Sequence, residues 1–214
     1  MDLLTAIFEL TVVLFLVFLN GFFVAAEFAI VKIRASRLET LIQEGNKRAK
    51  YAKVLTDHLD ASLSVTQLGI TLASLGLGWL GEPVVAYLLH PLIESLGLSA
   101  EVGHSIAFIL AFSFITALHI VLGELTPKSL AIQKVEKVVL GIALPMLVFQ
   151  RIMYPAVWVL NHVANWVLRQ IGVEVATEED AAHTEAEIRI LMEESHKQGY
   201  IDKTELTFVD NVFD

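Results

Sequence analysis

The segment GELTPKS at residues 123–129 places a carboxylate, a proline and a lysine at the end of a very apolar stretch. Proline has no amide hydrogen to donate to the carbonyl four residues earlier, so Pro127 leaves the Gly123 carbonyl without its helical partner. The Glu124 carboxylate follows directly, and together they offer two hard oxygen ligands for a cation. We therefore predict a cation site at Gly123 and Glu124, with Pro127 and Lys128 as hinge or gating residues. Lys128 could also pair with Glu124 or extend to the membrane surface.

Other polar side chains lie inside apolar stretches, where each costs free energy and is therefore a functional candidate. They are Asn20, Glu27, Gln67, Thr71, Ser74 and His119. Helical spacing aligns Asn20 with Glu27 and gathers the residues from Gln67 to Ser74 into one stripe. We predict them as further ligands, with His119 either a ligand or a hydrogen-bond donor between helices. Thr71 and Ser74 could instead serve helix packing, and Glu27 could pair with a basic residue near the surface.

Composition places most of these residues in a membrane. The 214-residue chain is 55% hydrophobic and only 18% charged, with a mean hydropathy of +0.63. These values are too apolar for an ordinary soluble domain. A membrane helix needs about 20 apolar residues, and three stretches qualify, at about 3–33, 61–89 and 102–126. We predict an all-α membrane protein whose residues 1–134 form a core of three transmembrane helices.

The ligand types and the charge exclude several classes of protein. The chain has no cysteine, which removes thiolate metal sites and thiol nucleophiles. Carboxylate, amide, hydroxyl and carbonyl oxygens favour Mg²⁺, Ca²⁺ or Na⁺. A net charge of −9 argues against nucleic acid as a partner. We also expect no enzyme activity, because no paired catalytic groups reach a soluble pocket.

Basic residues predict the orientation, because short cytoplasmic loops carry an excess of lysine and arginine. The connector at 90–104 has no lysine or arginine, whereas the segment after the first span is rich in both. The basic residues of that segment are Lys32, Arg34, Arg37, Lys47, Arg48, Lys50 and Lys53. We predict that the N-terminus lies outside and the C-terminus in the cytoplasm.

Residues 135–175 do not form a convincing span, since Gln150, Arg151 and Pro155 interrupt them. We predict amphipathic juxtamembrane helices in a belt, anchored at headgroup level by Trp158 and Trp166. A fourth span is the alternative, and it would place the C-terminus outside. Residues 176–214 are acidic and soluble in character, with two short helices on either side of Gly199. Their apolar helix face ends the chain uncovered, so we expect a further cytoplasmic domain after it.

Three motifs, in order, resemble one known family. They are NGFFVAAEFAIVKIR at 20–34, HLDASLSVTQLGITLASLGLGWLGEP at 58–83 and GELTPKSLA at 123–131. Together they resemble the transmembrane domain of the CNNM/CorC family of magnesium transporters, in its bacterial, hemolysin-related branch. The resemblance covers nearly the whole chain.

The resemblance implies a homodimer in the cell membrane, in which three helices per subunit hold a dehydrated Mg²⁺. It also implies a belt of juxtamembrane helices and an acidic bundle that leads to a pair of ATP-binding CBS domains. Matching positions would be Glu124, the carbonyl near Gly123, Thr71 and Ser74. Many members carry serines where this chain has Val24 and Ala26, so Asn20 or a backbone carbonyl would replace a serine ligand and Mg²⁺ selectivity could be looser.

These expectations favour a transporter that exports Mg²⁺ in exchange for Na⁺, with Gly123 and Pro127 providing the hinge that alternating access needs. The alternative is a membrane Mg²⁺ sensor or scaffold that regulates another transporter. A pore-forming hemolysin is suggested only by the naming of the branch, and three spans around a closed polar site do not favour it.

Overall fold

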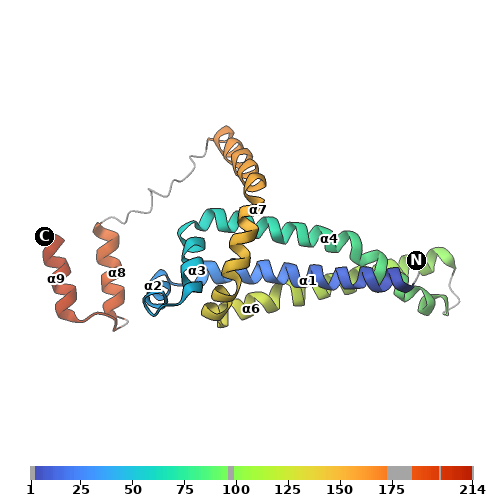
Figure 1. The fold of residues 1–214 in the computed structure, drawn as a ribbon, viewed down its shortest axis with the longest axis horizontal. Coiled ribbons are helices and arrows are strands. Elements are labelled where there is room, and N and C mark those ends of the chain that lie inside the picture. The colour runs from blue at the N-terminus through green and yellow to red at the C-terminus, as the bar shows by residue number, and fades with distance from the viewer. Residues whose placement is uncertain (1–2, 96–98, 173–184, 198, 214) are drawn as a thin grey trace. The chain divides into compact units, whose positions relative to one another are not determined.

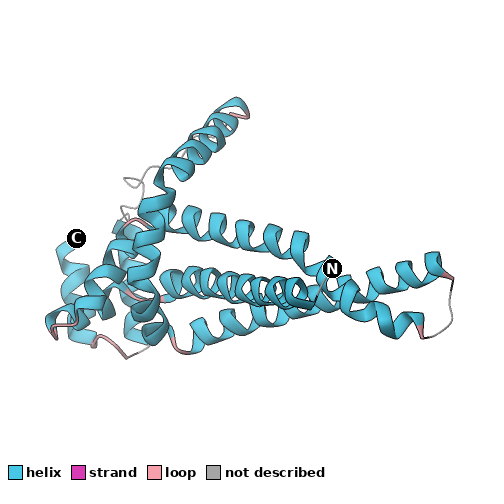
Figure 2. Ribbon diagram, turned by 45° about the vertical axis from the view of Figure 1, so that its right-hand side comes forward, coloured by secondary structure: helices cyan, strands magenta, loops and turns pink. Residues whose placement is uncertain are grey.

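The computed structural model describes residues 3–95, 99–172, 185–197 and 199–213, and all its regular elements are helices (Figures 1 and 2). In chain order they are α1 (Leu3–Lys32), α2 (Ala35–Gln43), α3 (Lys47–Asp57), α4 (Leu59–Glu94), α5 (Ala100–Leu118), the π-helix η1 (His119–Leu125), α6 (Thr126–Gln133), α7 (Val135–Gln170), α8 (Glu185–Lys197) and α9 (Lys203–Phe213). The chain divides into two compact units, residues 1–162 and 163–214. The all-α prediction is confirmed for the described residues.

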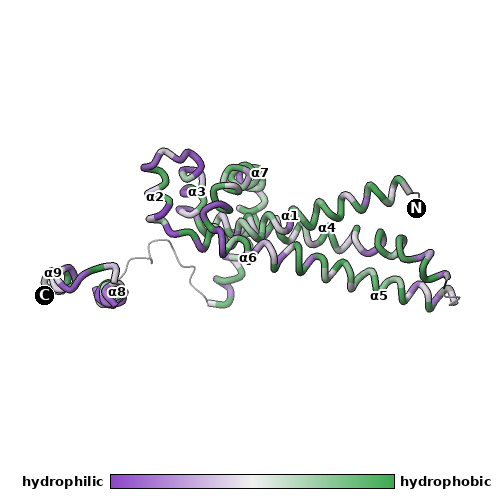
Figure 3. The backbone as a smooth tube through the Cα atoms, turned by 90° about the horizontal axis from the view of Figure 1, so that it is seen from below, coloured by the Kyte–Doolittle hydropathy of each residue, from purple (hydrophilic) through white to green (hydrophobic). Residues whose placement is uncertain are grey.

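Three long helical segments form the core of the first unit. They are α1, α4 and the continuous run of α5, η1 and α6, which lie side by side (Figure 1). Most of their residues are apolar, whereas the α2–α3 region carries long hydrophilic stretches (Figure 3). The end of α4 and the start of α5 lie at the same end as the N-terminus, and α2 and α3 lie at the opposite end (Figure 1).

The third long segment changes its hydrogen-bond pattern partway along. Residues 119–125 form a π-helix, and α6 then begins at Thr126 with Pro127 in its first turn. Pro127 has no amide hydrogen to donate to the preceding turn, and the Gly123 carbonyl four residues earlier accepts from the Asn20 side chain instead. The chain therefore stays helical where a break at Pro127 was predicted, and only the pitch of the helix changes.

Two short helices form a hairpin at the end of α1. Gly45, with φ +86°, supplies the left-handed turn between them, and the Asn46 side chain caps α3 by accepting a hydrogen bond from the Arg48 amide at 3.0 Å. The Arg37 guanidinium of α2 donates to Glu136 at the start of α7, at 2.9 Å. This hydrogen bond and the charge of Glu136 raise the pKa of Arg37. The hairpin is thus fastened to α7.

Residues 135–170 differ from the prediction, because they form one helix rather than separate short helices. Pro145 and Pro155 both lie inside α7. Four helical segments, α7 included, are long and apolar enough to cross a membrane, so the predicted count of three spans is not confirmed. Up to residue 162, however, α7 runs across α1 and α4 and not alongside them (Figures 1 and 3). The predicted belt of amphipathic juxtamembrane helices is likewise not confirmed.

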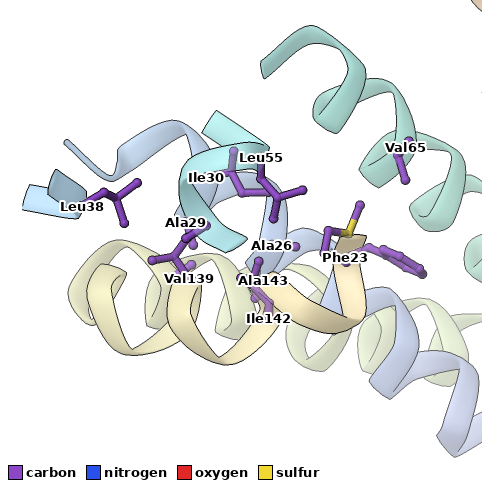
Figure 4. Close-up of a cluster of buried hydrophobic side chains, with 14 of the residues drawn as sticks. Phe23, Ala26, Ala29, Ile30, Leu38, Leu55, Val65, Val139, Ile142 and Ala143 are labelled. Atoms are coloured by element: carbon purple, nitrogen blue, oxygen red, sulfur yellow. The ribbon is translucent and has the colours of Figure 1, made fainter. Parts of the chain in front are cut away.

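Two apolar clusters hold the first unit together. The first, cluster A, lies toward the α2–α3 end and gathers side chains from α1, α2, α3, α4, α6 and α7 (Figure 4). Its completely buried members include Leu38, Leu55 and Met146. The second, cluster B, lies nearer the N-terminal end and joins α1, α4 and α5 through Val13, Val17, Leu77, Val85, Ala111 and Ile115.

The second unit comprises the end of α7 together with α8 and α9, and α8 contacts α9. Between these two helices, Gly199 has φ +77°. Asp202 and Glu205 form a reciprocal capping pair, in which each side chain accepts from the other residue's amide at 2.8 Å. Residues 173–184, where the predicted belt gives way to the predicted bundle, lie outside the described residues.

Candidate functional site

Asn20 lies at the centre of a polar cluster that joins the three core segments. Its side chain is completely buried in α1. The amide nitrogen Nδ2 donates to the Gly123 carbonyl of η1 at 3.0 Å, and the amide oxygen Oδ1 accepts from the Ser74 hydroxyl of α4 at 3.1 Å. Because a buried amide is costly without partners, these two bonds fix the positions of α1, α4 and η1 relative to one another.

His119 and Glu124 extend this cluster. His119 Nε2 lies 3.3 Å from the Ser74 hydroxyl and 3.8 Å from Glu124 Oε1. In an α-helix, with about 3.6 residues per turn, residues five apart lie on widely separated faces. The i to i+5 hydrogen bonds of a π-helix place them on the same side. The π-helix is therefore what brings the imidazole and the carboxylate together.

Glycines allow the helices to approach closely here. A Cβ atom on Gly21 would lie 2.9 Å from Pro127 Cγ and 3.2 Å from the Leu122 carbonyl oxygen. A Cβ on Gly123 would lie 2.9 Å from His119 Cδ2 and 3.1 Å from Asn20 Nδ2. Gly21 is a contact that the sequence reasoning missed. Its signal was a small residue beside Asn20 inside an apolar span.

The two predicted hinge residues both contact α1. Pro127 packs against Gly21. The Lys128 ammonium lies 4.6 Å from the centre of the Phe28 ring, which is within the range of a cation–π interaction. The Glu124 carboxylate faces His119, so the alternative of an ion pair between Lys128 and Glu124 is not what the structure shows. Whether this segment acts as a hinge stays a prediction.

Three predicted ligands do not join the polar cluster. Thr71 is exposed and its hydroxyl donates to the Gln67 carbonyl in its own helix at 2.8 Å. The Gln67 side chain is exposed. Glu27 is half-buried, and no hydrogen bond or ion pair joins it to another described residue. Glu27 lies closer to the α2–α3 end of α1 than Asn20 does. Gln67 and Thr71 lie closer to the same end of α4 than Ser74 does.

The positions where the resembled family often has serine are apolar and packed. Ala26 is completely buried and Val24 nearly so. Val24 follows Asn20 by one helical turn, so it lies on the same face of α1. Asn20 therefore supplies the polar contacts of α1 in this region.

The cluster has the chemistry of a hard-cation site. Asn20, Ser74, Gly123 and Glu124 offer amide, hydroxyl, carbonyl and carboxylate oxygens. No three His, Asp or Glu side chains of the described residues gather to hold a metal ion, so a cation here would depend on these neutral oxygens besides Glu124. Cluster A and cluster B flank Asn20 along α1 and Ser74 along α4.

A helical membrane protein with a polar cluster between its long helices is the class that the fold and this site define. Within that class, residues 11–205 match the family described as CNNM, the cyclin M transmembrane N-terminal domain. The chain belongs to this family, and the resemblance seen in its motifs is confirmed.

Curated relatives agree with this assignment. UPF0053 protein YhdP of Bacillus subtilis (strain 168) is 47% identical over 208 residues, which are 97% of this chain and 47% of that protein. UPF0053 protein YhdT of the same organism is 48% identical over 199 residues, 93% of this chain and 43% of that protein. Uncharacterized protein MT1889 of Mycobacterium tuberculosis is 37% identical over 207 residues, 97% of this chain and 58% of that protein. The chain thus spans about half the length of these relatives.

Proposed function

We propose that this protein transports Mg²⁺ across the cell membrane, exporting it from the cytoplasm in exchange for Na⁺. The observation that carries the proposal is the cluster in which the Asn20 amide joins Ser74 of α4 to the Gly123 carbonyl of η1. It is polar, lies between three apolar helical segments and contains the oxygen types that Mg²⁺ binds. Glu124 supplies the negative charge, and His119 lies beside it.

The Asn20 amide, the Ser74 hydroxyl and the Gly123 carbonyl satisfy one another by hydrogen bonds. The Asn20 Nδ2 group donates to the carbonyl that a cation would use. A Mg²⁺ ion entering the cluster must displace this donor, which leaves a buried polar group without a partner at a cost of about 1–3 kcal/mol. Ligation by the same oxygens offsets this cost. Binding would therefore rotate the Asn20 side chain and loosen its tie to η1.

The distribution of polar groups supports a route to the cluster from the α2–α3 end. Glu27, Gln67 and Thr71 lie between the cluster and that end of the long helices. We propose them as secondary ligands for the ion on its way from the cytoplasm, with the basic α2–α3 hairpin inside and the N-terminus outside. Gly123, Pro127 and Lys128 would form the hinge.

The proposal extends to partners and regulation. We also propose homodimerisation and regulation by ATP-binding CBS domains, because the family resemblance implies both and the chain spans about half the length of its relatives.

Mg²⁺ flux in proteoliposomes that contain only the purified chain tests the transport function. We expect flux that depends on an opposing Na⁺ gradient and is lost in Glu124→Gln, which keeps the side-chain size and removes the charge. Glu9→Gln is the matched control, because Glu9 lies near the N-terminal end of α1, away from the Asn20 cluster. This variant should transport normally. Size-exclusion chromatography of both variants shows whether they are folded.

Two outcomes would count against the proposal. Undiminished transport by Glu124→Gln would remove Glu124 from the site. Mg²⁺ binding that depends on Glu124, without flux in any sample, would favour the alternative of a membrane Mg²⁺ sensor or scaffold that regulates another transporter.

A further inference from the structure

The C-terminal end of α4 and the N-terminal end of α5 carry a second group of polar side chains, separate from the Asn20 cluster. The two helices approach closely at Gly103, where a Cβ atom would lie 3.2 Å from Ile93 Cγ2. Glu94 and His104 are the next residues along the two helices. The close approach therefore holds the last turn of α4 against the first turns of α5.

A cavity of about 410 Å³ lies at this contact. Its lining consists of His90, Ile93, Glu94, Ser99, Gly103, His104 and Ala107. His90 and Glu94 are one helical turn apart, and His90 Nδ1 lies 3.6 Å from Glu94 Oε1. Two imidazoles, a carboxylate and a hydroxyl therefore face one small volume at the rim of an apolar bundle, in a region where no lysine or arginine competes for them.

We propose that His90, Glu94 and His104 bind a divalent transition metal of the Zn²⁺ class. Two imidazoles and one carboxylate, with a fourth position left for water, are a common ligand set for Zn²⁺. Residues at i and i+4 on a helix present their side chains together, so α4 supplies two ligands and α5 the third. The Asn20 cluster is rich in oxygen and suits Mg²⁺, whereas imidazole ligands favour the softer ions.

The three side chains must move by rotation to reach ligand distance, since no three such groups of the described residues are gathered already. Their exposure permits this: the side chains of His90 and Glu94 are 62% and 70% exposed, and His104 is also exposed. Bound Zn²⁺ would link α4 to α5 at the end of the bundle opposite the α2–α3 hairpin. The site does not depend on the proposed transport function.

Calorimetric titration of the metal-free, detergent-solubilised chain with ZnCl₂ tests this site. We expect one Zn²⁺ to bind per chain. His90→Ala and His104→Ala should each weaken binding by about tenfold or more, since even residues that only support metal ligands contribute that much. His162→Ala, which removes an exposed imidazole from α7, is the matched control and should bind Zn²⁺ like the unaltered chain. A large excess of Mg²⁺ should leave the bound Zn²⁺ in place.

His119→Ala separates this site from the Asn20 cluster. Retained binding in His119→Ala, with loss in His90→Ala and His104→Ala, supports the proposal. Loss in His119→Ala alone, displacement by Mg²⁺, or no Zn²⁺ binding by the unaltered chain would overturn it. Equal unfolding temperatures of the metal-free variants show that weaker binding does not result from misfolding.

Discussion

Cluster A and cluster B lie on either side of the same polar site, yet they are built differently. Cluster A gathers side chains from six helices and uses alanines of α1, such as Ala26 and Ala29, to let its neighbours approach. Cluster B joins only α1, α4 and α5, mainly through larger residues such as Val17, Leu77 and Ile115. The α2–α3 end is therefore cross-braced by short helices, and the other end depends on the long helices alone.

This difference indicates which side of the site can open more readily. Separating the helices at cluster B breaks contacts among three elements, whereas separating them at cluster A also requires α2, α3 and α7 to move. A region with fewer buried apolar contacts opens at lower free energy. We expect the end near the N-terminus to be the more mobile one.

A matched pair of leucine truncations should show the largest effect. Leu55 of cluster A is 0% exposed and Leu77 of cluster B is 1% exposed. Leu55→Ala should lower the free energy of unfolding by about 2–5 kcal/mol, because a braced site cannot collapse onto the cavity. Leu77→Ala should cost less, since the helices around it can close or admit a lipid chain. Chemical unfolding in detergent measures both, and equal losses would contradict the proposed difference in bracing.

Adding a methyl group at Gly123, between the two clusters, should have an intermediate effect on the free energy of unfolding. Gly123→Ala places a Cβ 2.9 Å from the His119 ring and 3.1 Å from Asn20 Nδ2. Overpacking of this kind costs about 1–3 kcal/mol, and it should also displace the Asn20 amide.

Gly141→Ala provides the control for this change, because nothing lies within 4 Å of its added Cβ. It should be neutral or stabilise α7 by up to about 1 kcal/mol through better helix propensity. Thermal unfolding compares the two variants. A neutral Gly123→Ala would show that the contact between α1 and η1 is loose.

Loss of the ion pair that fastens the hairpin to α7 should show the smallest effect. The Arg37 and Glu136 side chains are 46% and 40% exposed, and water and salt screen such pairs strongly. Arg37→Gln should lower the unfolding temperature slightly at low salt and not at high salt. The double variant with Glu136→Gln should be no worse than either single variant. A large loss that persists in high salt would mean that Arg37 supports cluster A by packing instead.

Helical periodicity and the cost of polar groups in apolar stretches predicted much of the site. Both signals pointed to Asn20, Ser74 and His119, which the structure brings together with the Gly123–Glu124 pair, and their role as ligands stays a prediction. Spacing could not separate Ser74 from Thr71, because residues three apart differ by about 60° around a helix. Only the rotation of α4 against α1, which packing sets, decides which of the two faces Asn20.

The course of residues 135–170 was beyond this kind of reasoning. A polar pair at Gln150 and Arg151 and two prolines are typical of helix ends, but surrounding contacts can override such local signals. Here Val139, Ala143 and Met146 are buried in cluster A and hold the first half of α7 in place. The π-helix could not be foreseen either, since a break at proline and a change of pitch before it have the same sequence signal.

The π-helix at 119–125 also determines the register of everything that follows it. A segment bonded from i to i+5 contains one residue more than the α-helical turn it replaces. If these residues changed to α-helical bonding, each later residue would turn by about 100° and move by about 1.5 Å along the axis. Pro127 would then leave Gly21, and Lys128 would leave the Phe28 ring. A change of pitch within seven residues is thus enough to give α6 a different face against α1 without bending either helix.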